Sequence, residues 1–450
     1  MIQNKDELLA ALRDRSAPAH GMLSLLFDEG EYTELSAGCE GRGGQTVITA
    51  YGYANGTPVY AFAQNSAVSG GAVDAVHAAK IAHMFDLAAR NGMPVVGIYD
   101  SHGAFTDDGV TALDSYSLML GKITELSGTV PTISVITGVC SGSMSLAAAS
   151  ADLVAMTADA ELYLEASSPY SAAAAAENGT AHITADTAEE IFEKVKRYIS
   201  LMPQNDLSPV PEYEYDLPAE CDFSDAAHAA ASIADAGSVF ELSPDFGGAA
   251  YTALCTIEGV TAGITAINKT RDKLMPHDLQ KIARFVRLCD AYGIAVVTVA
   301  DSEGIADKGC AARSLVRLAG AYSEAVCPKI TVISGKACGV IFTAFAGKNV
   351  AADMTIALPD AVIAPLEPLT AAEFLYHDRL AGVKDTAAAR EEIAKEYALT
   401  EASPFNAAKA GTIDCVTDAA GVRSAVSSAL EFSAGKRLLK RLPKKHSVLC

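Results

Sequence analysis

The chain has 450 residues, half of them hydrophobic and 20% charged, a composition that supports sizeable buried cores and excludes a wholly disordered chain. Its 34 basic and 55 acidic residues give a net charge of −21, which argues against a general nucleic-acid-binding protein and against docking on anionic lipid. The charged N-terminus lacks the apolar core of a signal peptide, and no stretch of about 18 residues stays apolar. We therefore expect a cytoplasmic protein without a membrane span, whose ten cysteines are reduced and, lacking any CxxC pair, form no zinc ribbon.

The first half of the chain predicts helices that alternate with strands. An amphipathic helix over about 80–91 ends at a glycine suited to a C-cap, and a short apolar strand follows over 95–99. That strand stops at Asp-Ser-x-Gly, a turn signal that begins at Asp100. After a further helix, a second buried strand over 133–137 enters a glycine-containing loop, and an alanine-rich helix comes next. This alternation predicts an α/β fold.

A change of composition marks the middle of the chain. The segment 203–220 carries four prolines and several acids, which is typical of a linker. We place the boundary within 200–235 and expect two domains, 1–215 and 216–450. The alanine-rich stretch 167–186 before the linker predicts a helix and a loop without chemistry.

The second half of the chain repeats the first. Segment 80–103 aligns without a gap to segment 281–304, an offset of 281 − 80 = 201 residues. The next blocks, 130–143 and 327–340, align at an offset of 327 − 130 = 197 residues, so strands are expected over 295–300 and 330–334. The recurring residues are Lys80, Ile81, Gly92, Val96, Asp100, Ser101, Gly103, Pro131, Gly138 and Gly142, matched by Lys281, Ile282, Gly293, Val297, Asp301, Ser302, Gly304, Pro328, Gly335 and Gly339.

Two strand–loop–helix junctions, 138–143 and 335–340, are the most informative places in the repeat. A loop that enters a helix exposes backbone N–H groups without an intrahelical partner, and glycine lets another molecule approach them closely. Two such groups and the helix dipole can hold a negatively charged oxygen. The alternative is tight packing at a turn that binds nothing. Recurrence of the turn in both halves favours two oxyanion sites, which suit a reaction between two carbonyl partners.

The order and spacing of several segments resemble a known family. From about Gly21 to His446 the chain is similar to the carboxyltransferase components of biotin-dependent carboxylases and decarboxylases. These are the β-type subunits of propionyl- or acetyl-CoA carboxylase and the α-type subunit of methylmalonyl-CoA decarboxylase. The segments that carry the resemblance are LLFDEGEYTEL (25–35), YGYANGTPVYAFAQNSAVSGG (51–71), PVVGIYDSHGA (94–104), RFVRLCDAYGIAVVTVAD (284–301), AYSEAVCPKITVISGKACG (321–339), SPFNAAKAGTIDCV (403–416) and KKHSV (444–448).

The resemblance implies a fold, an assembly and partners. The fold would be a duplicated crotonase-like spiral, with ββα units in two superhelical domains, and the protein a hexamer built as a trimer of dimers. The N-terminal domain would hold a small acyl-CoA, and the C-terminal domain would hold biotin on a separate carrier, the two facing each other from different subunits. The chain contains neither a biotin-attachment sequence nor an ATP-grasp signature. Its implied partners are therefore a biotin carboxyl carrier protein and a biotin carboxylase or membrane decarboxylase subunits.

The same resemblance assigns the site residues. The amides of Gly142 and Ser143 would stabilise the thioester enolate, and those of Val340 and Ile341 would stabilise the biotin urea oxygen while the carboxyl group moves between biotin N1 and the acyl α-carbon. Thr343 would line the pocket and influence which acyl size fits. The further substrate-binding positions are Gly103, Ala104 and Gly339.

The chain also departs from the family pattern. Ser143 replaces a glycine and keeps the backbone donor, whereas Val340 and Ile341 replace Gly-Ala and are expected to narrow the biotin pocket. Phe105 stands where relatives have arginine, and Glu303 where they have proline. These departures indicate a divergent member and leave a second interpretation open, a non-catalytic scaffold paralogue in a carboxylase or decarboxylase complex.

Other residues allow rival interpretations. His102 would be a general base or a simple loop residue, and Cys140, Ser141 or Ser143 would be the nucleophile of a crotonase-fold acyl-CoA hydrolase, although no GxSxG elbow is present. The acids Asp107, Asp108 and Asp114 show no ligand spacing, so no metal is expected. A basic run would contact CoA phosphates or an acidic partner, or form a solvated helix face; it comprises Lys436, Arg437, Lys440, Arg441, Lys444 and Lys445.

Overall fold

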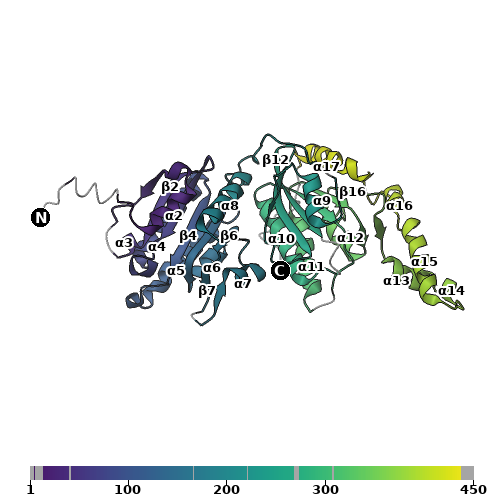
Figure 1. Ribbon diagram of the computed structural model, residues 1–450, viewed down its shortest axis with the longest axis horizontal. Helices are drawn as coiled ribbons and strands as arrows, with labels where there is room; N and C mark the ends of the chain where they lie inside the picture. The colour runs from purple at the N-terminus through teal and green to yellow at the C-terminus, as the bar shows by residue number, and fades with distance from the viewer. Residues whose placement is uncertain are drawn as a thin grey trace, which may run out of the picture. The chain divides into compact units, whose positions relative to one another are not determined.

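The protein is described by a computed structural model, which covers residues 5, 14–39, 42–165, 167–219, 221–267, 273–306 and 309–436. The chain divides into two compact units, Met1–Pro211 (unit 1) and Glu212–Cys450 (unit 2). In Figure 1 unit 1 runs from purple to teal and unit 2 from teal through green to yellow. Each unit contains its own sheet, flanked by helices.

The sheet of unit 1 has the strand order β1-β2-β3-β4-β5-β6-β9. β2 and β3 form an antiparallel hairpin at Asn55-Gly56, where both residues have positive φ and suit a tight hairpin turn. From β3 onward neighbouring strands are parallel, because helices connect them. The bounds are β1 Tyr32–Leu35, β2 Val47–Ala54, β3 Thr57–Gln64, β4 Val95–Ser101, β5 Thr132–Ser141, β6 Leu153–Thr157 and β9 Ile183–Ala185, with β7 Glu161–Tyr163 and β8 Pro169–Ser171 attached beside β5.

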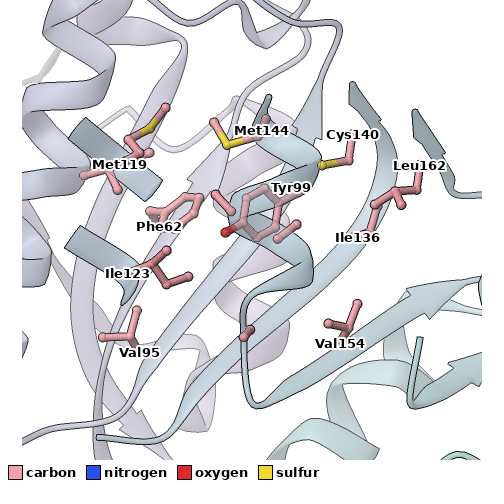
Figure 2. Packing of buried hydrophobic residues seen from close by; sticks show 14 of the residues in the cluster. Phe62, Val95, Tyr99, Met119, Ile123, Ile136, Cys140, Met144, Val154 and Leu162 are labelled. Carbon is pink, nitrogen blue, oxygen red and sulfur yellow. The ribbon is translucent and has the colours of Figure 1, made fainter. Parts of the chain in front are cut away.

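The helices of unit 1 bury their apolar sides on this sheet. Helix α4 packs against β2, β3 and α5, and helix α8 packs against α2, β5, β6 and β9. Figure 2 shows the hydrophobic core of unit 1, where the rings of Phe62 and Tyr99 pack edge to face with their centroids 5.2 Å apart. The bounds are α2 Pro18–Leu26, α4 Ala75–Asn91, α5 Thr111–Leu126, α6 Met144–Ala149, α7 Ala172–Glu177 and α8 Ala188–Leu201.

Unit 2 contains a second sheet of the same plan, in the order β10-β11-β12-β13-β14-β16-β18. Its strands are β10 Phe240–Glu241, β11 Ala250–Ile257, β12 Val260–Ile267, β13 Ala295–Ala300, β14 Lys329–Ile333, β16 Met354–Ala357 and β18 Cys415–Val416, with β15 Lys336–Cys338 and β17 Val362–Ala364 as a separate pair. Its helices are α9 Ala226–Ile233, α10 Pro276–Ala291, α11 Ala311–Glu324, α12 Val340–Phe345, α13 Pro368–Leu375, α14 His377–Leu380, α15 Thr386–Leu399, α16 Pro404–Lys409 and α17 Ala419–Ser433.

The predicted repeat forms matching helices and strands in the two units. Helices α4 and α10 begin five residues before the first residue of the aligned segments, because Asp74 caps α4 and Asp278 closes a capping box on α10. One boundary was predicted wrongly: β4 does not stop at Asp100 but continues to Ser101. There Ser101 pairs with Cys140 of β5 across an irregular register. The alanine-rich stretch 167–186 holds α7 and a loop as predicted, but also two short strands that the prediction missed.

The proline-rich segment is partly attached to unit 2. Glu212 bridges to Val260, and the Tyr213 amide donates to the Gly259 carbonyl at 2.8 Å. Gly259 has a φ of 81°, and a Cβ there would lie 2.1 Å from the Tyr213 carbonyl oxygen. The hairpin between β11 and β12 therefore needs glycine to accept this segment. Among the residues that the structure describes, no helix combines the length and the apolar character that crossing a membrane requires.

Candidate active site

The first glycine turn connects β5 to α6 in unit 1. Gly142 has a φ of 64°, which favours glycine, and its carbonyl accepts from the Ser145 amide at 3.1 Å and the Ser145 hydroxyl at 2.6 Å. Met144 is 1% exposed and anchors the start of α6 in the core. The amides of Gly142 and Ser143 make no hydrogen bond with the described residues. The turn thus presents two neighbouring N–H groups, as the first turn of a helix does.

The carboxylate of Asp100 binds the main chain that leads into this turn. Asp100 accepts the Val139 amide at 3.3 Å and also accepts the Ser66 hydroxyl. A Cβ on Gly138 would lie 2.2 Å from the Asp100 carboxylate, so only glycine leaves room for the contact. We call this contact the aspartate clamp: an aspartate at the carboxyl end of one parallel strand holds the main chain where the next strand enters the glycine turn.

The loop after β4 lies next to the turn. Its Gly103 has a φ of 119° and donates its amide to the Ser101 hydroxyl at 3.2 Å, while its carbonyl accepts the Val73 amide at 2.9 Å. A Cβ built on Gly103 would lie 3.2 Å from the Ser141 hydroxyl oxygen. The structure therefore brings Gly103 and its neighbour Ala104 to the residues that lead into Gly142.

Unit 2 repeats these contacts. Asp301 accepts the Lys336 amide at 2.9 Å, and a Cβ on Gly335 would lie 2.2 Å from its carboxylate. Gly304 donates to the Ser302 hydroxyl at 3.1 Å, and its carbonyl accepts the Leu274 amide at 3.0 Å. The aspartate clamp and the neighbouring loop are therefore duplicated together with the glycine turn.

The two turns differ in which amides lack a partner. In unit 2, the Gly339 amide donates to the Ala364 carbonyl at 2.9 Å. The next two amides, those of Val340 and Ile341 in the first turn of α12, make no hydrogen bond with the described residues. Gly142 matches Gly339 in the repeat, so the unpaired amides begin one residue later in unit 2. These are the four residues that the family resemblance assigned to the two oxyanion holes, an assignment that stays a prediction.

The side chains at the second turn point in different directions. Ile341 is 1% exposed and belongs to the core of the unit, so the expectation that it narrows the pocket is wrong. Val340 is 53% exposed and remains as the β-branched side chain beside the amides. Thr343 is exposed one turn further along α12, and its hydroxyl donates to the Gly339 carbonyl at 3.1 Å.

The candidate nucleophiles lack what a hydrolase requires. Cys140 lies in the apolar cluster with Tyr99, Met144 and Leu162, and burial raises its pKa far above the usual thiol value (Figure 2). Burial likewise raises the pKa of Cys338 to about 11. Both thiols are therefore protonated near neutral pH.

No histidine activates a serine at the first turn. The hydroxyls of Ser141 and Ser143 have no imidazole partner among the described residues, and the imidazole of His102 makes no hydrogen bond there either. Among the described residues, the first turn therefore supplies backbone donors and no Ser–His pair of the kind that a triad requires, and a role of His102 as general base stays a prediction.

An ion pair beside the second turn was not predicted. The Lys336 amine lies 2.8 and 2.9 Å from the two carboxylate oxygens of Glu303. The offsets of the repeat place His102 and Val139 at these positions in unit 1, so the pair exists only in unit 2. The departure at Glu303 was visible in the sequence, but its partner lies 33 residues away and required the fold.

Two further expectations concern metals and the basic run. The described residues contain no group of three or more His, Cys, Asp or Glu side chains that could hold a metal ion. Lys436 donates to the Cys327 carbonyl at 2.8 Å and pairs with Asp353 at 2.7 Å, so it stabilises unit 2. The rest of the run, 437–445, lies outside the described residues.

Known proteins are similar to this chain over nearly its whole length. Residues 22–449 match the family model of the carboxyl transferase domain. The chain is 30% identical to the methylmalonyl-CoA decarboxylase subunit alpha of Propionigenium modestum, over 95% of this chain and 92% of that one. It is 32% identical to the propionyl-CoA carboxylase beta chain of Cereibacter sphaeroides, over 93% and 91%.

Among solved structures, a similar one is transcarboxylase 12S, determined as a hexamer assembly with methylmalonyl-coenzyme A and methylmalonic acid bound. The TM-score is 0.91 at 26% identity, and the match covers 100% of this chain and 98% of that one. This similarity confirms the predicted duplicated crotonase-like fold.

Proposed function

Because the chain belongs to the carboxyl transferase family, as the resemblance predicted, we propose that it moves a carboxyl group between carrier-bound biotin and a small acyl-CoA. The observation that carries this proposal is the duplicated pair of unpaired amides, Gly142 with Ser143 and Val340 with Ile341. Each pair can hold an oxygen that gains negative charge in a transition state. Removing one such donor typically costs about 10²–10³ in rate.

Each unit takes one partner in this proposal. Unit 1 binds the acyl-CoA, and the amides of Gly142 and Ser143 stabilise the thioester oxygen as the enolate forms. Unit 2 binds biotin, and the amides of Val340 and Ile341 stabilise its urea oxygen. The burial of the Ile341 side chain supports this assignment, because Ile341 then does not cover the unpaired amides of α12. Of these two side chains, only that of Val340 is exposed beside them.

The protein's own contribution is mainly electrostatic. Biotin supplies the carboxyl group at N1 and, once that group has left, a base for the α-proton of the acyl group. The chain then has to bind both partners, align the two oxygens with the amides and exclude water. The unpaired amides of Gly142 and Ser143 support this division of labour.

The acyl group and the assembly are finer parts of the proposal. The names of the relatives favour propionyl- or methylmalonyl-CoA, while acetyl- and malonyl-CoA remain within the small acyl-CoA class that the resemblance implied, with transfer in either direction. We also propose a hexamer, as in the transcarboxylase structure, and a biotin carboxyl carrier protein as partner. A biotin carboxylase, or the membrane subunits of a decarboxylase, would complete the complex.

The first test measures CO2 release from malonyl-CoA and methylmalonyl-CoA by the purified protein, with and without free biotin. Release that depends on biotin is expected and would rank the two acyl groups. If the folded protein binds neither acyl-CoA, the proposal is wrong for unit 1. If it binds acyl-CoA but stays inactive with free biotin and with a biotinylated carrier, transfer is not its activity.

One observation favours a second candidate, the non-catalytic scaffold paralogue. Val340 is 53% exposed beside the amides of the second turn, where relatives carry glycine. If this side chain blocks biotin, Val340→Gly should create biotin-dependent turnover in an otherwise inactive protein and leave association with a carboxyltransferase homologue intact. Turnover in the unaltered protein would exclude the scaffold role.

A further inference from the structure

A chain of buried polar side chains in unit 1 leads from the start of α4 to the aspartate clamp. Its members are Thr46 (0% exposed), Gln64 at the end of β3 (3%) and His77 in the first turn of α4 (0%). The nitrogen Nε2 of His77 lies 3.3 Å from Nε2 of Gln64, and Nδ1 lies 2.8 Å from the Thr46 hydroxyl oxygen. None of these residues belongs to the two oxyanion holes.

The hydrogen bonds in this chain have one direction. The Asp100 amide donates to Oε1 of Gln64 at 3.2 Å, a bond that only the amide oxygen can accept. Nε2 of Gln64 therefore faces His77 and donates, so the imidazole accepts at its Nε2 and carries its proton on Nδ1. That proton is donated to Thr46, whose hydroxyl donates to the Gly43 carbonyl at 3.2 Å.

The imidazole is neutral in this arrangement. Burial lowers the pKa of His77 to about 3, an effect that the nearby ammonium of Lys80 reinforces and the carboxylate of Asp74 opposes. With its proton on Nδ1, the neutral ring pairs with Gln64 through one nitrogen and with Thr46 through the other, and the backbone of Ala72 also interacts with the ring. Such fully paired networks fix a unique geometry, because any other arrangement leaves a buried polar group without a partner.

The chain of bonds ends at the residue that holds the first glycine turn. Gln64 fixes the main chain of Asp100, whose carboxylate holds the Val139 amide three residues before Gly142. Ser66, two residues after Gln64, donates to the same carboxylate. The position of the two unpaired amides thus depends on contacts that begin at His77.

In unit 2 the positions that match Gln64 and His77 carry other residues. The strand register pairs Val47 with Gln64 in unit 1 and Ala250 with Ile267 in unit 2, so an isoleucine occupies the glutamine position. Asp278 stands at the His77 position, where its carboxylate caps the amides of Ala249 and Met275 instead. Among the described residues, the Gln64–His77 contact is therefore found only in the unit proposed to bind acyl-CoA.

We propose that His77 and Gln64 are positioning residues for the thioester oxyanion hole: they orient Asp100, and through it the amides of Gly142 and Ser143. The inference rests on the proposed function, since it assumes that a thioester oxygen binds at this turn. Positioning errors of about 1 Å cost on the order of 10²-fold in rate, so loss of the chain should act on catalysis more than on binding.

The variants are Gln64→Leu, which removes both bonds of the glutamine, and Asn65→Leu as the matched control. Asn65 follows in sequence, is 4% exposed and donates to the Gln45 carbonyl at 3.1 Å, so it is equally buried but outside the chain of bonds. Gln64→Glu is the conservative rescue. The carboxylate still accepts the Asp100 amide, and it pairs with His77 when the imidazole is protonated.

Two readouts separate positioning from stability. Isotope-edited infrared spectra of bound propionyl-CoA, labelled with ¹³C at the thioester carbonyl, report how strongly the amides polarise that carbonyl. Steady-state kinetics report kcat and KM for the acyl-CoA. For Gln64→Leu we expect a weaker frequency downshift, a fall in kcat of about 10–10²-fold and an acyl-CoA KM within about twofold. Asn65→Leu should match the unaltered protein, and Gln64→Glu should recover activity toward acidic pH.

The outcomes distinguish the inference from the proposed function. An unchanged downshift and kcat in Gln64→Leu would overturn the positioning role while leaving the carboxyl transfer intact. Equal losses in Gln64→Leu and Asn65→Leu would show a general effect of destabilisation and would also overturn it. If the unaltered protein neither binds propionyl-CoA nor turns over any acyl-CoA, the proposed function fails and the inference falls with it.

Discussion

The two glycine turns of this protein share a clamp but differ around it. Asp100 and Asp301 hold the Val139 and Lys336 amides in the same way, and neither allows a side chain on the glycine just before. Above the clamp the turns diverge, because the Gly339 amide is used by a carbonyl of unit 2 while the Gly142 amide is not. The amides available to a ligand therefore start at the glycine in unit 1 and one residue after it in unit 2.

This difference teaches how a duplicated fold acquires two distinct sites. Duplication retained the glycines and the contacts of an aspartate carboxylate with the main chain, which tolerate changes elsewhere. The parts that differ are side chains at equivalent positions, such as Gln64 against Ile267 and His102 against Glu303. A buried glutamine that contacts a histidine lies next to the first turn, whereas an isoleucine occupies the glutamine position in unit 2 and a surface ion pair lies beside the second turn.

The largest expected effect comes from deleting one amide in each turn. Ser143 has a φ of −66°, which proline adopts, and Val340 is the first residue of α12, where proline is tolerated. Ser143→Pro and Val340→Pro should each lower the rate of biotin-dependent CO2 release by about 10²–10³-fold. The matched controls Ser143→Ala and Val340→Ala keep the donor and should stay near the unaltered rate. A proline variant that is folded and fully active would exclude its amide from catalysis.

The same pair sharpens the assignment of the two units. Any residual release of CO2 from malonyl-CoA in the absence of biotin needs only the enolate hole, so Ser143→Pro should lower this residual rate and Val340→Pro should not. Both activities are measured on the same preparation by CO2 release. The reverse pattern would exchange the roles proposed for the two units.

The second prediction breaks the clamp in both units. Gly138→Ala and Gly335→Ala each place a Cβ at 2.2 Å from a carboxylate oxygen, so the clamp must shift. We expect each variant to lose about 1–3 kcal/mol of the free energy of unfolding, as overpacking typically does, measured by urea denaturation. Similar losses would show that the clamp contributes equally to the free energy of unfolding in both units. An unaffected variant would show that the clamp of its unit contributes nothing to stability.

These turns also show how far the sequence could predict the site. The repeated glycines, prolines and Asp-Ser pairs predict the two strand–turn–helix junctions, because such signals act over a few residues. The donor shift in unit 2 was contained in the residues that the family resemblance implied, but its physical cause, a bond from Gly339 to Ala364 25 residues further along the chain, could not be derived from local sequence signals. The burial of Ile341 depends on packing against distant residues. The extension of β4 through Asp100 and Ser101 likewise depends on pairing with β5.

The buried polar side chains of unit 1 could not be predicted as a cluster for the same reason. Gln64 and His77 are unremarkable in sequence, and each is as compatible with a surface position as with a buried one. Only strand register and helix packing bring them to Asp100. An alignment of the two halves beyond the repeated blocks would have matched the polar Gln64 to the apolar Ile267.

The third prediction concerns a buried lysine that each unit contains. The Lys281 amine donates to the Ala250 carbonyl at 2.8 Å, and burial lowers its pKa to about 8. In the unfolded chain its pKa is about 10.4, so between these values the unfolded state binds a proton that the folded state has lost. The free energy of unfolding should therefore rise with pH over this window, by at most about 1.4 kcal/mol per pH unit from this group.

Urea denaturation at pH 8 and pH 10 tests this lysine, with Lys281→Met as the comparison. The variant should lose this part of the pH dependence, because every other titrating group is common to both proteins. Lys80 in unit 1 donates to the Gly44 and Val47 carbonyls and has a pKa lowered in the same direction, also by burial. Equal slopes in the unaltered protein and in Lys281→Met would show that the amine titrates in the folded state as it does in the unfolded chain.

The smallest expected effect concerns the ion pair that only unit 2 has. The side chains of Lys336 and Glu303 are 36% and 47% exposed, so water screens their attraction. We expect Glu303→Gln to change the free energy of unfolding by less than about 1 kcal/mol and to leave the Kd for acyl-CoA unchanged. Because the pair lies beside the second turn, any effect on turnover should appear in the KM for biotin. A change confined to the acyl-CoA Kd would contradict the assignment of biotin to unit 2, since the altered residue belongs to that unit alone.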